Sequence, residues 1–150
     1  MNVRVGEPAI LPIARFDVDG GEGSTSSLRF DAVALPLAPD GRVIEAQFSV
    51  RDRFLVVLSD DVPYEERLVF QLFDASPQLI DTLEFGGPYT PGLFRVVNTT
   101  DTPSVVFTFE GDTRYELRIH DEPRRWLSSL PGVRRRGGPF RPHHLELKTA

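Results

Sequence analysis

Cysteine is absent from this chain of 150 residues, and lysine, tryptophan and methionine each occur once. Without thiols the chain has no route to cysteine catalysis, thiolate metal sites, disulfides or redox chemistry. The longest unbroken apolar run is residues 54–58, far below the roughly 18 residues that a membrane-spanning helix needs. The apolar run near the N-terminus is interrupted by Pro12 and does not match a secretion signal. We therefore expect a soluble, cytoplasmic protein.

Charge is divided unevenly along the chain. The net charge of −5 combines a body, residues 1–122, with a net charge of −11 and a C-terminal segment, residues 123–150, with a net charge of +6. The segment contains one acidic residue, Glu146, among its basic ones. We predict an acidic domain over 1–122, followed by a basic segment over 123–150 that packs on the domain or on a partner.

Apolar and polar residues alternate with a period of two through most of the body, which is typical of β-strands. Residues 42–50 place four apolar side chains on one face, namely Ile44, Ala46, Phe48 and Val50. Residues 53–59 and 67–73 are apolar on both faces, which predicts central strands that are covered on both sides. About eight or nine strands with short loops indicate an all-β fold, either an antiparallel β-sandwich or a barrel-like meander.

The last two strands of the body are predicted to form a hairpin. One face of the first strand carries Val105, Phe107 and Phe109, and one face of the second carries Tyr115, Leu117 and Ile119. A one-residue slip would turn all of these side chains to the wrong face, so the loop must hold an odd number of residues. The simplest loop is 111–113, with Glu110 opposite Arg114. Upstream, a change in the apolar phase predicts a bulge near Ala32.

Acidic residues gather in the loop between the two central strands, at Asp60, Asp61, Glu65 and Glu66. Four carboxylates at one turn could bind a cation or an arginine-rich partner, and paired carboxylates can perform acid–base chemistry. The alternative is an ordinary solvated hairpin loop. We favour that alternative as far as catalysis and metal binding are concerned, because no nucleophile lies nearby in the sequence.

The three histidines are weak candidates for a metal site. Adjacent side chains on a strand point to opposite faces, so His143 and His144 cannot both bind one ion without an irregular backbone. His120 could join them only if the C-terminal segment folds back. Ser128, Ser129 and His120 are residue types that hydrolases use for catalysis. The G-x-S-x-G motif of a nucleophile elbow, however, is missing. We expect no metal, no cofactor and no enzymatic activity.

The basic segment is predicted to begin with a short helical turn. Pro123 suits the start of a helix, and a turn after it would bring Trp126, Leu127 and Leu130 to one side before Pro131 ends it. We expect Trp126 to close one end of the fold. The rest of the segment is predicted to bind a surface in extended form, and its contact residues are Arg134, Arg135, Arg136, Phe140 and Arg141.

Three partners fit the basic segment. Nucleic acid would bind the arginines through its phosphates and stack on Trp126 or Phe140, although the acidic body would repel a long polyanion. An acidic protein surface suits the guanidinium groups equally well. Alternatively, the segment lies on its own strands, or on those of a second copy, by adding residues 144–147 to a sheet edge. Charge favours the two protein contacts.

These patterns predict a non-enzymatic protein-binding module, such as an adaptor, an assembly subunit or an inhibitor or immunity-type protein. The predicted partner contacts fall on two surfaces, the basic segment with Trp126, Arg134, Arg135, Arg136, Phe140 and Arg141, and the acidic loop with Asp60, Asp61, Glu65 and Glu66. A nucleic-acid-binding accessory protein that uses the basic segment is the first alternative, and a small hydrolase-like enzyme is the second.

Overall fold

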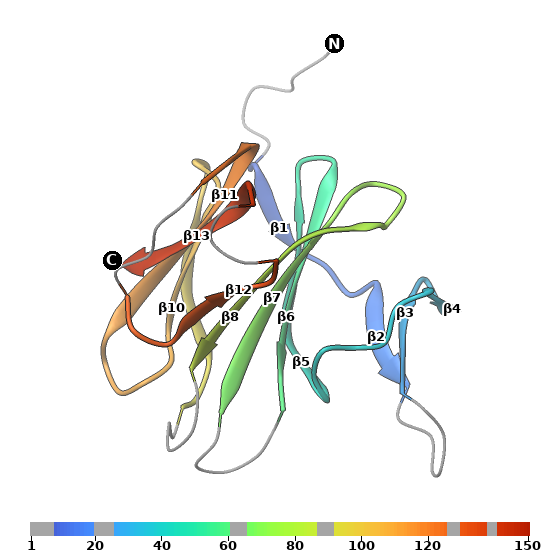
Figure 1. Ribbon diagram of the computed structural model, residues 1–150, viewed down its shortest axis with the longest axis horizontal. Coiled ribbons are helices and arrows are strands. Elements are labelled where there is room, and N and C mark those ends of the chain that lie inside the picture. Colours follow the sequence, from blue (N-terminus) through green and yellow to red (C-terminus); the bar gives the residue numbers. More distant parts are fainter. Residues whose placement is uncertain (1–7, 20–25, 61–65, 87–91, 126–129, 138–140) are drawn as a thin grey trace.

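The computed structural model describes residues 8–19, 26–60, 66–86, 92–125, 130–137 and 141–150 (Figure 1). The regular structure in these ranges is entirely β-strand, and neighbouring strands run antiparallel, so the all-β prediction is confirmed. No helix of the described ranges is long and apolar enough to cross a membrane.

The described residues form thirteen strands, more than the eight or nine predicted. The excess consists mainly of strands of two to four residues, which are too short to show an alternating pattern in the sequence. The strands are β1 (Ile10–Pro12), β2 (Phe16–Asp19), β3 (Ser27–Phe30), β4 (Val33–Ala34), β5 (Val43–Val50), β6 (Arg53–Ser59), β7 (Arg67–Phe73), β8 (Leu79–Gly86), β9 (Arg95–Thr100), β10 (Ser104–Thr108), β11 (Arg114–Arg124), β12 (Val133–Arg135) and β13 (His143–Thr149).

The strands belong to three sheets. The largest sheet has the order β1-β5-β6-β7-β8-β12, the second β13-β11-β10-β9, and the smallest β2-β3-β4. In Figure 1 the four-stranded sheet lies to the left of the six-stranded sheet and the three-stranded sheet lies to its right. The six-stranded sheet therefore lies between the other two.

Strands β6 and β7 are buried on both faces, as predicted for residues 53–59 and 67–73. Leu55 and Phe70 belong to the hydrophobic cluster shared with the four-stranded sheet, whereas Val56 and Val69 belong to the cluster shared with the three-stranded sheet. Aromatic rings join the two larger sheets directly, because the ring of Phe70 lies 5.5 Å from that of Phe107 between centroids. Hydrophobic burial on both faces makes these two strands the centre of the fold.

Strand β5 departs from strict alternation. A bulge between Ile44 and Ala46 shifts its register against β6. As a result Ala46, Phe48 and Val50 pack in the cluster shared with the four-stranded sheet, while Ile44 packs in the other cluster. The prediction of a single apolar face is thus right for three residues and wrong for Ile44, because an inserted residue reverses the facing of what precedes it.

The β10–β11 hairpin has the predicted facing but a different register. Phe107 lies opposite Tyr115 and Thr108 opposite Arg114, so five residues rather than three separate the paired strands. The pairing of Glu110 with Arg114 is therefore wrong. The reason is packing at the end of the core: the backbone carbonyl of Phe109 accepts a hydrogen bond from Leu93 N at 2.8 Å, and its ring is buried.

The bulge predicted near Ala32 is instead a tight turn. Asp31 and Ala32 both have positive φ, and Phe30 lies opposite Val33 across the β3–β4 hairpin. Positive φ at both central residues is characteristic of two-residue hairpin turns that match the twist of their strands. A turn and a bulge both change the phase of a pattern, which is why the sequence did not distinguish them.

The helical turn predicted after Pro123 is wrong in the part that the structure describes. Pro123 and Arg124 continue β11, because Arg124 pairs with His143 of the C-terminal strand. Trp126 and Leu127 lie outside the described residues. Beyond them the basic segment forms two strands: β12 joins the edge of the six-stranded sheet beside β8, and β13 joins the edge of the four-stranded sheet beside β11.

Candidate functional site

One buried carboxylate fastens the end of the chain to the body. Asp81, on β8, is 7% exposed and accepts four hydrogen bonds. Two of the donors are the backbone amides of His144 and Leu145, at 2.8 and 2.9 Å, and the third is Nδ1 of His143 at 2.7 Å. Thr82 N is the fourth. Charge-assisted bonds in a buried place are strong, so Asp81 fixes the start of β13 against β8.

The histidines confirm the facing predicted for a strand. His143 is 2% exposed and lies on the inward face of β13, whereas its neighbour His144 is half-buried on the other face. His120 contacts Glu146 instead, with 3.0 Å between Nε2 and Oε1. Within the ranges that the structure describes, no group of three metal-binding side chains comes together.

Arg135 lies between the two strands of the basic segment. Its Nη1 donates to the carbonyl of Leu145 at 2.6 Å, while Nε and Nη2 are buried and have no hydrogen-bond partner among the described residues. Burial lowers the pKa of Arg135, and the nearby charges of Asp81 and Glu146 act in the opposite direction. Arg135 therefore connects β12 to β13 rather than pointing freely into solvent.

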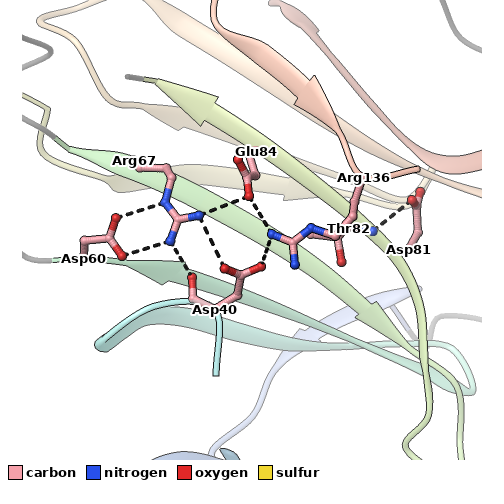
Figure 2. A network of polar contacts seen from close by, with 7 residues as sticks. All are labelled: Asp40, Asp60, Arg67, Asp81, Thr82, Glu84 and Arg136. Atoms are coloured by element: carbon pink, nitrogen blue, oxygen red, sulfur yellow. Dashed lines mark hydrogen bonds and ion pairs between the residues drawn. The ribbon is translucent and has the colours of Figure 1, made fainter. Parts of the chain in front are cut away.

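A second set of contacts surrounds Arg67, at the start of β7 (Figure 2). Nε and Nη2 of Arg67 donate to the two carboxylate oxygens of Asp60 at 2.9 and 3.0 Å, which is a bidentate ion pair. Nη1 donates to Glu84 at 3.0 Å and to Asp40 at 3.4 Å. The hydrogen bond to Asp60 is the largest influence that raises the pKa of the guanidinium, so Arg67 remains charged.

Arg136 of the basic segment completes this network. Its Nη2 lies 2.7 Å from Glu84 and 2.5 Å from Asp40, so Figure 2 shows both acids between the two arginines. Asp40 and Glu84 each have only 17% of their side chain exposed, whereas Arg136 has 54% exposed. The acidic body thus neutralises part of the basic segment within the same chain.

The predicted contact residues have different positions. Asp60 and Arg136 meet in the Arg67 network, and Arg135 is largely enclosed. Arg134 and Arg141 are exposed, and Glu66 is half-buried. The remaining predicted contact residues, Trp126, Phe140, Asp61 and Glu65, lie outside the described residues. The role of all of them in binding a partner stays a prediction.

Sequence reasoning missed Asp81, Arg67, Asp40 and Glu84. For Asp81 a signal existed, since a lone carboxylate between apolar residues in "LIDTLEF" needs a buried partner. Arg67 stands directly between the acidic loop and an apolar strand, which also indicates a paired charge. Neither signal identifies the partner, because the donors to Asp81 lie more than 60 residues away along the chain.

The four outer strands of the two larger sheets are protected unequally. β12 carries Arg134 and Arg135, and β13 carries Glu146 and Lys148; charges of this kind discourage another strand from pairing. β1 has three residues and ends in Pro12, which lacks the N–H that pairing requires. In β9, by contrast, residues 96–100 contain neither charge nor proline. The side of the fold with β9 is therefore the less protected one.

An apolar groove lies on this side, between β5 and β9. It has a volume of about 590 Å³; its apolar lining includes Ile13, Ile44, Ala46, Phe48 and Val96, and Glu45, Gln47, Asn98 and Thr99 supply polar groups. Val96 and Val97 each remain 41% exposed on β9. A groove of this size beside an unpaired strand edge suits an extended chain that pairs through its backbone and inserts side chains.

Comparison of this chain with family models, with curated proteins and with solved structures found no match in any of the three.

Replacing Asp81 with asparagine should weaken the attachment of the C-terminal strand. The amide group would present a donor where the carboxylate accepts, so we expect Asp81→Asn to lower the free energy of unfolding by about 2–4 kcal/mol. Urea denaturation at neutral pH measures this change. Asp121→Asn is the matched control, because Asp121 is 64% exposed in its ion pairs and its loss should cost less than about 1 kcal/mol. Equal losses in the two variants would contradict the assignment.

Removing the guanidinium of Arg67 should also destabilise the fold, since Asp60 would lose its bidentate partner and the other two carboxylates would keep only Arg136. We expect Arg67→Met to cost about 1–3 kcal/mol, a range that allows for solvent screening at 30% exposure. Arg29→Met removes an arginine from a more exposed pair, with Asp17, and should cost clearly less than Arg67→Met. In about 1 M salt the destabilisation caused by Arg29→Met should fall by a larger fraction than that caused by Arg67→Met. The reason is that the Arg67 network is more enclosed and is therefore screened less.

Proposed function

We propose that this protein is a non-enzymatic protein-binding module and that it binds through the groove side of the fold, between β5 and β9. The observation that carries the proposal is an apolar groove beside an edge strand whose residues 96–100 contain neither charge nor proline. An adaptor or an assembly subunit needs such a surface. The lack of cysteine is the ground for proposing a cytoplasmic setting.

The proposal includes a two-layer arrangement, in which the six-stranded and four-stranded sheets are the layers of a β-sandwich. Support comes from the buried residues that both sheets contribute to one cluster and from ring contacts such as Phe85 with Tyr115, at 4.9 Å between centroids. In this arrangement the groove lies at one open side of the sandwich, and β12 and β13 lie at the opposite side.

The contacts of the basic segment favour this surface over a tail-mediated one. Arg136 is held in two ion pairs and Arg135 is largely enclosed, whereas the other arginines of the segment in the described part of the chain are exposed, namely Arg124, Arg125, Arg134 and Arg141. Part of the charge of the segment is thus compensated within the chain, and the body, with a net charge of −11, would repel a long polyanion. The nucleic-acid alternative therefore has less support than protein binding.

A capture experiment from the native host tests the proposal. Immobilised wild-type protein, a Val96→Lys variant and a Val33→Lys variant are compared, with bound proteins identified by mass spectrometry. Val96 lines the groove, whereas Val33 is 66% exposed on β4, away from it. We expect proteins retained by the wild type and by Val33→Lys to be lost with Val96→Lys, because a buried, unpaired lysine is costly.

Two results of this comparison would contradict the proposal. Retention of the same proteins by all three baits would place binding outside the groove. Retention that falls steeply with salt and disappears after nuclease treatment would support the nucleic-acid alternative instead.

A further inference from the structure

We propose that the partner which fits the β9 edge is a second copy of this chain, paired antiparallel through β9 about a twofold axis between Val97 and Asn98. The inference rests on the proposed function, since it names the occupant of the same surface. A twofold contact of this kind joins two four-stranded sheets into one continuous sheet.

The side chains of β9 are irregularly spaced. Val96 lies opposite Phe107 and Thr99 lies opposite Val105, with a register shift between these pairs. Phe107 and Val105 are buried in the core, and residues directly opposite each other share a face of the sheet. Val96 and Thr99 therefore both face inward although they are three residues apart. Regular alternation would place residues three apart on opposite faces.

This spacing restricts which strand can pair along the whole edge. A strand with regular alternation cannot match this pattern. If one of its side chains faces inward opposite Val96, its side chain opposite Thr99 faces outward. A second copy of β9 has the same irregularity. When the two strands are antiparallel, Val96 of each copy lies opposite Thr99 of the other, and both residues face inward. The bulge, which discourages pairing with ordinary strands, thus favours pairing with itself.

Charged residues at the two ends of β9 also favour this pairing. Arg95 begins β9, and Asp101 follows its last residue. Arg95 forms no ion pair with the described residues, and Asp101 uses Oδ1 to accept a bond from Ala9 N at 3.1 Å. Antiparallel pairing about the proposed axis sets each Arg95 opposite Thr100 of the other copy, beside that copy's Asp101. Opposite charges therefore meet at both ends of the contact.

The contact is small, which sets the concentration at which it should be measured. One strand of six residues with a groove beside it buries less surface than the interface of a standard stable complex, so we expect a dissociation constant in the micromolar range. Sedimentation velocity from about 1 to 200 µM covers this range. The monomer has a mass of 16.8 kDa, and the wild type should move from this mass toward twice this value as its concentration rises.

Charge exchange provides the decisive variants. Arg95→Glu should weaken the dimer at least about tenfold at low salt, because each glutamate would meet an aspartate of the other copy. Asp101→Arg should weaken it similarly, since two arginines would then be adjacent. The double variant restores opposite charges, and an equimolar mixture of the two single variants does so as well. Both should recover association. Val33→Lys, away from the edge, should associate like the wild type.

The outcomes separate this inference from the proposed function. A wild type that remains a monomer to about 200 µM, or a dimer that both single charge variants leave unchanged, would overturn the second copy as the occupant. If host proteins were still captured by the wild type and lost with Val96→Lys, the proposed function would stand and the groove would bind a different chain. Folding of each variant is checked by thermal melting, and Val97→Lys replaces any charge variant that does not fold.

Discussion

The architecture depends on one buried carboxylate. Asp81 lies near the start of β8 and would be costly to bury if its oxygens were not satisfied by donors. Three of its four donors come from the start of β13, more than 60 residues further along the chain. The requirement is mutual, since the amides at the start of β13 would otherwise be buried without acceptors. The end of the chain is therefore part of the fold.

This attachment explains why an acidic body and a basic segment occur in one chain. Considered alone, a C-terminal segment with a net charge of +6 suggests an arm that reaches for a polyanion. In the structure its strands pair with β8 and β11, and Arg136 joins the acidic groups around Arg67. The opposite charges of the two parts of the chain attract each other in cis. The segment also leaves charged residues along the outer strands of that side, where they discourage further pairing.

On the opposite side of the fold, residues 96–100 of β9 carry no charge, and the apolar groove opens there. The functional proposal follows from this difference between the charged outer strands β12 and β13 and the uncharged stretch of β9. A surface that keeps exposed valines beside unpaired backbone groups carries a risk of aggregation, which is acceptable where a partner covers it. The bulge in β9 limits which partner that is.

The sequence predicted the all-β class and the two central strands, because burial on both faces leaves an unmistakable run of apolar residues in β6 and β7. It also predicted the facing of the β10–β11 hairpin by parity alone. It did not predict the register of that hairpin, since Phe109 is held by packing with a distant loop. The donors to Asp81 and the edge position of β9 cannot be predicted from the local sequence, because both depend on which strands become neighbours in the fold.

The central claim is that the basic segment is a fixed part of the fold and that its attachment does not depend on screened surface charge. Residue-resolved amide hydrogen exchange of the wild type, at about 0.05 and about 1 M salt, tests this most directly. The account predicts that the amide of Leu145, which donates to Asp81, and those of Glu146 and Lys148, which face β11, exchange as slowly as those of Leu117 and Ile119 in β11, at both salt concentrations. Exchange of these β13 amides at the rate of an unstructured peptide, or loss of their protection in high salt, would contradict it.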